Sequence, residues 1–367
     1  MSRTWTEIVS PVLRDNIRCV RAAVEPRSDL IFVVKADAYG HGMPGVVKVA
    51  WDEGIRRFAV AHLDEAETLR QCLPDAQVLM IGVLDPATVA RAAALRLVPA
   101  LTGPRHADAL AREARQAGVV LPCHVKIDTG MGRLGFDWQR AVDELRVAGG
   151  LGGLRIEGAY THLAASDAAD RAFADEQMRR FRLVVAGCRA AGIPIPFLHV
   201  SNSGAFQRDR EWHLDAVRMG ILLYGYPPIP AALPANIRPF LQWKTRVIQI
   251  RDVPARYPVS YDSTFHTQAP TRLAVLNVGY ADGYSRALSN RGMVLLGGRR
   301  CPVRGRVTMN LTMVDAGPDA PVKEGDEVVL IGCQGGEMIG ADDLAQWQGT
   351  IAYEVLTSIR TPDRREA

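Results

Sequence analysis

The sequence predicts an α/β protein with an N-terminal (β/α)8 TIM barrel and a C-terminal, mainly antiparallel β domain. Two patterns lead to this fold class. Short β-branched runs alternate with longer amphipathic segments from about residue 30, and a proline-rich stretch then separates them from short alternating runs. We place the barrel at residues 10–230 and the β domain at residues 231–367, and we expect residues 1–9 to join the β domain.

Eight short apolar runs are the predicted strands of the barrel. Helix-like segments such as DEAETLRQCL and RHADALAREARQAG separate them, and the second of these runs into glycine, as helix ends often do. Eight strands with intervening helices favour a closed barrel over the alternative, an open doubly wound sheet. The runs are IFVVKAD (31–37), RFAVAHL (57–63), QVLMIG (77–82), RLVPALT (96–102), PCHVKID (122–128), RIEGAYTHL (155–163), PFLHVSNS (196–203) and DAVRMGILLYG (215–225).

The sequence becomes rich in proline after Tyr224, and this change in composition marks the predicted domain boundary. The stretch YPPIPAALPANIRP cannot continue a helix or a central strand, because proline lacks the backbone donor that both need. Beyond it we expect antiparallel strands and a final helix near residues 341–360, and the early run TWTEIV is a candidate to pair with these strands. The predicted strands are WKTRVIQIRDV, TRLAVLNVGY, GMVLLGG, RCPVRGRVTMNLTMVDA and DEVVLIG.

Composition and charge exclude several classes of function. The chain has 367 residues, 48% of them hydrophobic, and its net charge of +4 is too small and too dispersed for a nucleic-acid surface. The N-terminus MSRTWTEIVS lacks the apolar core of a signal peptide, and the most apolar later stretch is broken by prolines before it could span a bilayer. We therefore expect a cytoplasmic protein with no nucleic-acid or membrane partner.

The spacing of cysteine and histidine argues against a metal centre. The six cysteines lie far apart with no CxxC pair, which is typical of buried, reduced thiols rather than of a disulfide framework or a zinc site. The eight histidines show no HExxH or other paired spacing. We predict no bound metal.

Lys35 is the first candidate for chemistry, because an apolar run delivers it to the end of a predicted strand. Taken alone, it is explained as a lysine that extends its charge to the rim of the fold. In a TIM barrel, however, the carboxyl ends of the strands carry the active site. A lysine in a partly dry pocket can attack a carbonyl and form a Schiff base with a substrate or with pyridoxal phosphate.

Polar residues also stand at other predicted strand ends. Lys126 lies near the end of the fifth run and Arg133 just beyond it. His162 lies at the end of the sixth run, Ser203 at the end of the seventh, and Arg218 within the eighth. Each alone has a structural explanation, such as an ion-pair partner or a core histidine. Their agreement on one face of the barrel favours a functional site, and small residues after strands seven and eight are the usual phosphate cradle of this fold.

In order and spacing, nine segments resemble motifs of the pyridoxal-phosphate-dependent alanine racemases. The resemblance covers essentially the whole chain. The segments are VVKADAYGHG, KIDTGMGRLGF, THLAASD, SNSGA, VRMGILLYG, VSYDSTF, GYADGYSR, RVTMN and AYEVLTSI.

The resemblance implies that Lys35 holds pyridoxal 5'-phosphate and acts as one base. Tyr261 matches the opposite base, which in this family comes from the other subunit of a homodimer with shared active sites. Arg218 matches the arginine that contacts the pyridine nitrogen, and His162 matches the residue that, with Arg218, orients the tyrosine. Arg133 corresponds to the residue near the phenolic oxygen of the cofactor and the substrate carboxylate.

Further roles follow from the same resemblance. Lys126 matches a lysine that is often carbamylated in relatives, and Tyr280 a residue lining the substrate access path. Met309 matches a backbone donor to the substrate carboxylate. The phosphate-binding positions are matched by Tyr39, Ser203, the backbone of Gly220 and Ile221, and Tyr353.

These residue types suit racemisation. The reaction removes a proton from one face of the α-carbon and returns one to the other, so it needs bases on opposite faces. The cofactor delocalises the charge that develops. An arginine at the pyridine nitrogen will not give up its proton, which keeps the ring a weaker electron sink and should limit side reactions.

One segment departs from the family pattern. Where relatives usually have Cys-Met-Asp-Gln, this chain has Thr308-Met309-Asn310-Leu311. The amide of Asn310 can both donate and accept a hydrogen bond, so it would accommodate a hydroxymethyl side chain better than aspartate. Our hypothesis is that serine is accepted alongside alanine.

The leading interpretation is an alanine racemase that makes D-alanine of the kind used in the bacterial wall. One alternative is a serine or broad-specificity amino-acid racemase. Another is a pyridoxal-phosphate decarboxylase of the same barrel type (fold type III), in which we would expect an acidic group in place of Arg218. The third is a non-catalytic carrier of the cofactor, against which the extra β domain with Tyr261 and Tyr353 argues.

Overall fold

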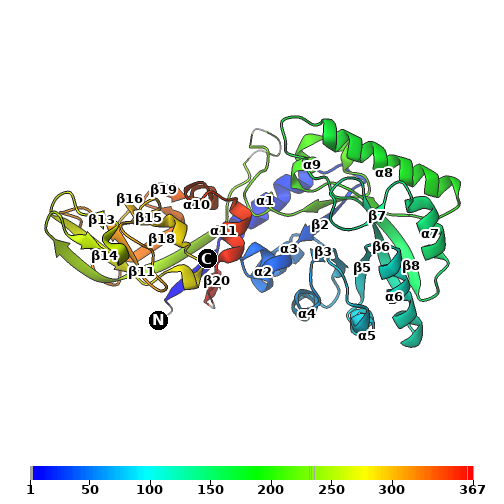
Figure 1. The fold of residues 1–367 in the computed structure, drawn as a ribbon, viewed down its shortest axis with the longest axis horizontal. Helices are drawn as coiled ribbons and strands as arrows, with labels where there is room; N and C mark the ends of the chain where they lie inside the picture. The colour runs from blue at the N-terminus through cyan, green and yellow to red at the C-terminus, as the bar shows by residue number, and fades with distance from the viewer. Residues whose placement is uncertain (1–2, 231, 233, 235, 362, 367) are drawn as a thin grey trace. The chain divides into compact units, whose positions relative to one another are not determined.

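The computed structural model describes residues 3–230, 232, 234, 236–361 and 363–366 (Figure 1). Residues 231, 233 and 235, where we place the start of the second domain, lie outside the described residues, as do residues 1 and 2. The chain divides into two compact units. The barrel unit holds residues 14–38 and 47–237, and the β unit holds residues 1–13, 39–46 and 238–367.

Eight parallel strands form the barrel unit, which confirms the predicted fold class. They follow one another in the order β2-β3-β4-β5-β6-β8-β9, and β10 pairs with β2. Amide hydrogen bonds from Arg218 to Ser201 and from Asp215 to Leu198 join the last two strands. The strands are β2 (Asp29–Val33), β3 (Arg57–Val60), β4 (Gln77–Met80), β5 (Leu97–Leu101), β6 (Leu121–Asp128), β8 (Leu154–Tyr160), β9 (Leu198–His199) and β10 (Ala216–Met219), with the short β7 (Phe136–Asp137) beside β6.

Amphipathic helices cover the outside of the strands (Figure 1). Helix α6 (Pro104–Gln116) buries Ala107, Leu110, Ala111 and Ala114 and exposes its charged face, as its sequence pattern predicts. The other helices are α1 (Ser10–Ala23), α3 (Met43–Asp52), α4 (Leu63–Cys72), α5 (Val89–Ala94), α7 (Ala141–Gly149), α8 (Ala172–Ala190) and α9 (Ser203–Arg208), with 3-10 turns η1 (Pro86–Thr88) and η2 (Arg210–Trp212).

The turn α2 (Lys35–Tyr39) has a backbone that the sequence did not predict. Ala36, Asp37, Ala38 and Tyr39 all have φ of 53°, in the left-handed region that residues with a Cβ atom normally avoid. The amide of Ala38 still donates to the carbonyl of Val34 at 2.8 Å, so the chain makes one left-handed turn directly after strand β2. This turn fixes the direction in which Lys35 leaves the strand.

The β unit is a mainly antiparallel sheet built around the long strand β11 (Leu241–Val253). It pairs with β1 (Thr4–Ile8), β14 (Thr271–Leu276) and β18 (Glu327–Gln334). The remaining elements are β12 (Pro258–Val259), β13 (Phe265–His266), β15 (Met293–Leu296), β16 (Arg299–Pro302), β17 (Thr312–Asp315), β19 (Glu337–Ile339), β20 (Arg364–Glu366), η3 (Tyr261–Ser263), η4 (Tyr280–Asp282), η5 (Arg286–Leu288), α10 (Ala341–Gln348) and α11 (Ala352–Ser358).

Three local predictions differ from the structure. The run RCPVRGRVTMNLTMVDA forms two strands, β16 and β17, because its middle turns back in a loop held by Thr308. The final helix breaks into α10 and α11 at Gly349, whose φ of 77° ends the first helix. Of the six free cysteines, Cys333 is exposed and Cys19 and Cys72 are only half-buried. Among the described residues, no helix is long and apolar enough to cross a membrane.

Candidate active site

The barrel unit brings its predicted site residues to the carboxyl ends of its strands. Lys35 follows β2, Arg133 follows β6, His162 follows β8 and Ser203 follows β9, while Arg218 lies on β10. Since all eight strands are parallel, these ends meet at one mouth of the barrel. These residues therefore lie at the same end of the barrel, as the sequence predicted.

The amine of Lys35 has a reduced preference for its charged form. Burial and the nearby positive charge of Arg133 lower the pKa of Lys35, and Glu65 opposes them. Glu65 accepts hydrogen bonds from the amides of Ala36 at 2.6 Å and Ala61 at 2.7 Å, so it ties the left-handed turn to the next strand. The backbone beside Lys35 is thus fixed, and its amine is easier to deprotonate than that of a free lysine.

His162 lies where the cations of the site converge. Burial together with the charges of Arg218, Lys126, Arg133 and Lys35 lowers the pKa of His162 to about 3. The ring is therefore neutral near neutral pH. Its Nδ1 lies 3.4 Å from Nη2 of Arg218, and since a guanidinium can only donate, Nδ1 is the acceptor.

Arg218 is buried, with 4% of its surface exposed, and backbone carbonyls hold its guanidinium. Nη1 donates to the carbonyl of His199 at 2.8 Å, and Nη2 donates to the carbonyls of Thr161 at 2.8 Å and Val200 at 3.1 Å. Burial lowers the pKa of Arg218 to about 10, so it stays charged at neutral pH. Among the described residues, Nε of Arg218 has no hydrogen-bond partner.

Lys126 is a buried lysine without a carboxylate partner at contact distance among the described residues. Its Nζ donates to the carbonyl of Leu134 at 2.9 Å and lies 5.8 Å from the ring centre of Tyr160. Burial, with Arg218 and Arg133, lowers the pKa of Lys126 to about 8, although Asp128 opposes them. A fraction of this amine is therefore neutral and reactive near neutral pH.

The loop after β6 is shaped by Asp128, which the sequence analysis did not single out. Its carboxylate accepts from the amides of Gly130 at 2.9 Å, Gly132 at 3.2 Å and Arg133 at 3.2 Å. The side chain of Asp128 thereby folds the loop into a compact turn and fixes the backbone from which Arg133 projects.

Backbone amides after strand β10 gather around Ser203, which follows β9. Its Oγ accepts from the amides of Gly220 and Leu222, both at 3.3 Å. Within the part of the chain that the structure describes, the amide of Ile221 has no hydrogen-bond partner, although the residue is only 2% exposed. A buried donor without a partner in the protein is costly unless a ligand satisfies it.

In the β unit, three predicted site residues are exposed on loops that hydrogen bonds tie together. Tyr261 is 72% exposed, Met309 56% and Tyr280 44%. The amide of Tyr280 donates to the carbonyl of Thr308 at 3.1 Å, and Oγ of Ser260 donates to the carbonyl of Arg306 at 2.7 Å. Large exposed apolar and aromatic side chains gathered on fixed loops are typical of a binding surface.

The other predicted residues of the β unit lie in two places. Tyr39 is buried and its ring centre lies 6.0 Å from that of the half-exposed Tyr353. Burial raises the pKa of Tyr39, so its hydroxyl stays protonated. Asn310 lies in the turn held by Thr308, and its side-chain amide has no hydrogen-bond partner among the described residues. The amide of Met309 is likewise unpartnered there.

Sequence reasoning missed three residues inside the barrel. Nδ1 of His199 lies 2.9 Å from Nη1 of Arg218, and Nε2 of His199 lies 2.8 Å from Nδ1 of His124. The ring of Tyr160 stacks on His199 at 4.8 Å, and the guanidinium of Arg218 lies 5.1 Å from the centre of the same ring. The spacing of His124 and Lys126 was the available signal, because residues two apart in a strand share a face.

Comparison with protein families gives matches over nearly the whole chain. The family model described as "Alanine racemase, N-terminal domain" matches residues 9–228, and "Alanine racemase, C-terminal domain" matches residues 240–366. The chain is 42% identical over 362 residues to the alanine racemase of Carboxydothermus hydrogenoformans, covering 98% of both chains. It is 40% identical over 366 residues to that of Desulfosudis oleivorans, covering 97% of this chain and 94% of the relative.

Solved structures give the same result. The alanine racemase of Bacillus anthracis with bound L-Ala-P has a TM-score of 0.94 and 32% identity, covering 100% of this chain and 95% of that one. The alanine racemase of Bartonella henselae with covalently bound pyridoxal phosphate has a TM-score of 0.89 and 27% identity, with full coverage of both chains. No group of three or more metal-ligating side chains occurs among the residues that the structure describes.

Proposed function

The chain belongs to the alanine racemase family, and on that premise we propose that it interconverts L- and D-alanine with two bases, Lys35 and Tyr261. The observation that carries this proposal is the site of Lys35, whose pKa is lowered by burial and by Arg133. A lysine whose neutral form is favoured can bond to a carbonyl carbon and can also accept a proton. Both abilities are needed of this residue in racemisation.

The barrel residues fit pyridoxal 5'-phosphate as the cofactor. Lys35 offers the amine that would hold it, and the unpartnered Nε of Arg218 offers a donor for the pyridine nitrogen. The unpartnered buried amide of Ile221, beside Ser203 and Gly220, offers a donor for a phosphate oxygen. When bound, the cofactor supplies the electron sink that makes the α-hydrogen of an amino acid acidic enough to remove. On the family resemblance, Tyr39 and Tyr353 complete the phosphate site.

The charge on Arg218 separates the racemase from a decarboxylase of the same barrel type. The guanidinium keeps its proton at neutral pH, because its pKa is about 10, so it would offer the ring nitrogen of the cofactor a hydrogen bond without giving up its proton. An acidic residue at this position would share a proton and strengthen the electron sink. The arginine therefore favours a brief proton exchange at the α-carbon over reactions that need a long-lived negative charge.

We propose that Tyr261 acts in the active site of a partner subunit in a homodimer. Its phenol is exposed, yet its loop is tied to the next loop, because Oγ of Ser260 donates to the carbonyl of Arg306. An anchored loop that presents an uncovered phenol suits a base that serves another chain. The same loops would bring Tyr280 and the amide of Met309 to the substrate, with Arg133 and Met309 binding its carboxylate.

We also propose that serine is a second substrate. The side-chain amide of Asn310 has no partner among the described residues, so it can both donate to and accept from a substrate hydroxyl. An assay with L-serine tests this directly. Turnover of alanine with no detectable turnover of serine would refute it.

Two variants test the proposed mechanism. Lys35→Ala should abolish the Schiff-base absorbance of the cofactor and all racemisation, because the chain then lacks the covalent anchor. Tyr261→Phe should keep that absorbance but lose about 10²- to 10⁴-fold in turnover, chiefly from the L-enantiomer. Tyr257→Phe is a matched control on the same hairpin, where the phenol only accepts a bond from Arg251.

Two measurements identify the reaction: the incorporation of solvent deuterium at the α-carbon of alanine, and the release of carbon dioxide. Deuterium incorporation without carbon dioxide identifies a racemase, and carbon dioxide release identifies a decarboxylase. The absence of both signals would identify a non-catalytic carrier of the cofactor. Normal racemisation by Tyr261→Phe would show that the two-base assignment is wrong.

A further inference from the structure

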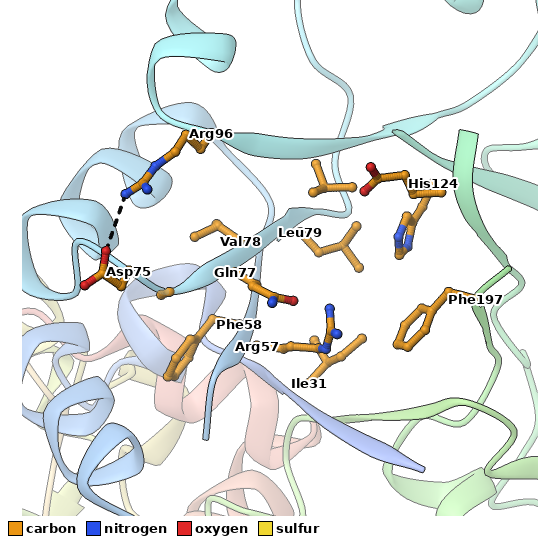
Figure 2. Close-up of a pocket in the computed structure, with 13 residues that line it drawn as sticks. Ile31, Arg57, Phe58, Asp75, Gln77, Val78, Leu79, Arg96, His124 and Phe197 are labelled. Atoms are coloured by element: carbon orange, nitrogen blue, oxygen red, sulfur yellow. Dashed lines mark ion pairs between the residues drawn. The ribbon is translucent and has the colours of Figure 1, made fainter. Parts of the chain in front are cut away.

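The amino-terminal end of the barrel contains a cavity that the proposed active site does not use. Its volume is about 450 Å³, and residues from the first halves of β3, β4 and β5 form much of its wall (Figure 2). Lys35, Arg133 and His162 follow the carboxyl ends of their strands, so this cavity lies at the other end of the same barrel. Apolar side chains of Ile31, Phe58, Val78, Leu79, Val98 and Phe197 line it.

Arg57 presents unused donors to this cavity. Its Nε pairs with the carboxylate of Asp29, whereas Nη1 and Nη2 have no hydrogen-bond partner among the described residues. The guanidinium lies over the ring of Phe197, with its central carbon 4.9 Å from the ring centre. In Figure 2 the side chains of Arg57, Phe197 and His124 are neighbours in the cavity wall.

A chain of three hydrogen-bonding groups determines what His124 offers. Arg218 can only donate, so Nδ1 of His199 must accept from it, and the hydrogen of that neutral ring is on Nε2. This Nε2–H therefore donates to Nδ1 of His124 at 2.8 Å. The hydrogen of His124 must then be on its own Nε2, which has no hydrogen-bond partner in the described part of the chain.

The electrostatics keep both rings neutral. Burial, Arg57 and Arg218 lower the pKa of His124 to about 4, and burial and Arg218 lower the pKa of His199 well below its usual value. His124 is only 8% exposed and lines the cavity, so its unpartnered donor belongs to a largely buried side chain. Such a group calls for an acceptor from outside the protein.

We propose that this cavity binds a small monocarboxylate with a short apolar body, whose oxygens accept from Arg57 and from Nε2–H of His124. A carboxylate suits these donors, because charge-assisted bonds to a guanidinium are strong and directional. The apolar body would lie along Phe197 and Leu79. The carboxylates of Asp75 and Glu157 also line the cavity and disfavour a ligand with a second negative charge.

Benzoate is a suitable probe, titrated calorimetrically into the holoenzyme. Saturating racemic alanine is present throughout, so that the substrate site is filled. We expect one benzoate bound per chain in the wild type and at least about 10-fold weaker binding in Arg57→Gln, because the variant loses a charge-assisted pair. Racemisation by Arg57→Gln should stay normal, since Arg57 belongs to the cavity and not to the active site.

Arg96→Gln is the matched control. Arg96 lines the same cavity, but its Nη2 already bonds to the carbonyl of Pro74 and lies 3.9 Å from Asp75, the pair drawn in Figure 2. This variant should bind benzoate like the wild type. Equal weakening in both variants would indicate a general effect of charge and would overturn the proposal.

A crystal of the wild type grown with 4-bromobenzoate and alanine gives a test that does not depend on any variant folding. The bromine signal is expected in this cavity, with the carboxylate at Arg57 and His124. A bromine signal confined to the carboxyl end of the barrel would overturn the proposal. The absence of binding heat at millimolar benzoate in the calorimetric titration would overturn it as well, and the cavity would then have no ligand-binding role.

Discussion

The two units of the chain hold their polar residues in opposite ways. Inside the barrel, Lys126, His199 and Arg218 are at least 96% buried. Arg218 and His199 hydrogen-bond to each other, and Arg218 and Lys126 also donate to backbone carbonyls. In the β unit, the interior around Trp243 and Leu295 is mainly apolar, although it also buries Asp282. The predicted site residues of this unit stand on exposed loops, such as the one bearing Tyr261.

This difference shows two ways of building reactive groups. Burial among like charges shifts the pKa values of the barrel residues, so the fold itself tunes them. A loop residue of the β unit is positioned but hardly desolvated. Changes in the barrel should therefore affect stability and protonation, whereas changes in the loops should affect turnover alone.

The largest effect is expected where the barrel loses its central cation. Arg218→Leu would leave the carbonyls of Thr161, His199 and Val200 without a donor, and should lower the free energy of unfolding by about 3 kcal/mol or more. Tyr280→Phe, on an exposed loop, should change it by less than about 0.5 kcal/mol. Urea unfolding measures both, and similar values for the two variants would remove the contrast between the units.

The next effect is a pH dependence that belongs to the barrel. Between pH 6.5 and about pH 4, the unfolded chain protonates His124 while the folded chain keeps it neutral, so stability falls as the pH falls. This histidine should contribute up to about 1.4 kcal/mol per pH unit in that window. His124→Gln should show a correspondingly smaller loss in urea unfolding at pH 6.5, 5.5 and 4.5. An unchanged slope would mean that the ring is already protonated in the folded state.

A substitution in the loops should change specificity without touching stability. Asn310→Asp replaces an amide that can donate by a carboxylate that only accepts, so kcat/KM for serine relative to alanine should fall about 10-fold. Steady-state assays with both amino acids measure this ratio. A ratio that stays constant would place the hydroxyl of serine away from Asn310.

The smallest effect concerns a modification of the barrel. The pKa of Lys126 is about 8, so its neutral amine becomes more abundant as the pH rises from 7 to 9, and only this form reacts with carbon dioxide. We predict a carbamate on Lys126, which would place a negative charge beside Arg133 and change turnover by a few-fold. Mass spectrometry under native conditions, with and without bicarbonate, should show it, and Lys126→Met should not. The same mass for the wild type in both conditions would contradict the prediction.

Much of the fold could be predicted from the sequence, because each of the eight apolar runs overlaps one strand of the barrel. The placement of His124 and His199 in the barrel interior could not be predicted. In PCHVKID, apolar and polar residues alternate, but a strand buried on both faces gives no sign of which face meets the barrel axis. Only the closed barrel shows that His124 shares the interior with Lys126 and His199. By contrast, the break between the last two helices was readable from Gly349, since glycine commonly ends a helix.

The site was predictable where a residue follows a strand, as Lys35 and His162 do. It was not predictable where a side chain of a loop hydrogen-bonds to the backbone of that same loop. Asp128 shapes the loop that carries Arg133 through three backbone amides, and no periodic pattern reveals such contacts. The loops of the β unit were located only through the family resemblance.

The left-handed turn after Lys35 has a consequence for engineering. Each of its four residues costs roughly 1–2 kcal/mol relative to ordinary helical backbone, a penalty that glycine would not incur. Glycine at Ala36 or Ala38 would therefore ease the local backbone while making the segment more pliable. A variant selected only for heat resistance could gain glycine at Ala36 or Ala38 and so lose the fixed orientation of the Lys35 amine. Selection for thermal stability and selection for activity would therefore favour different residues at these two positions.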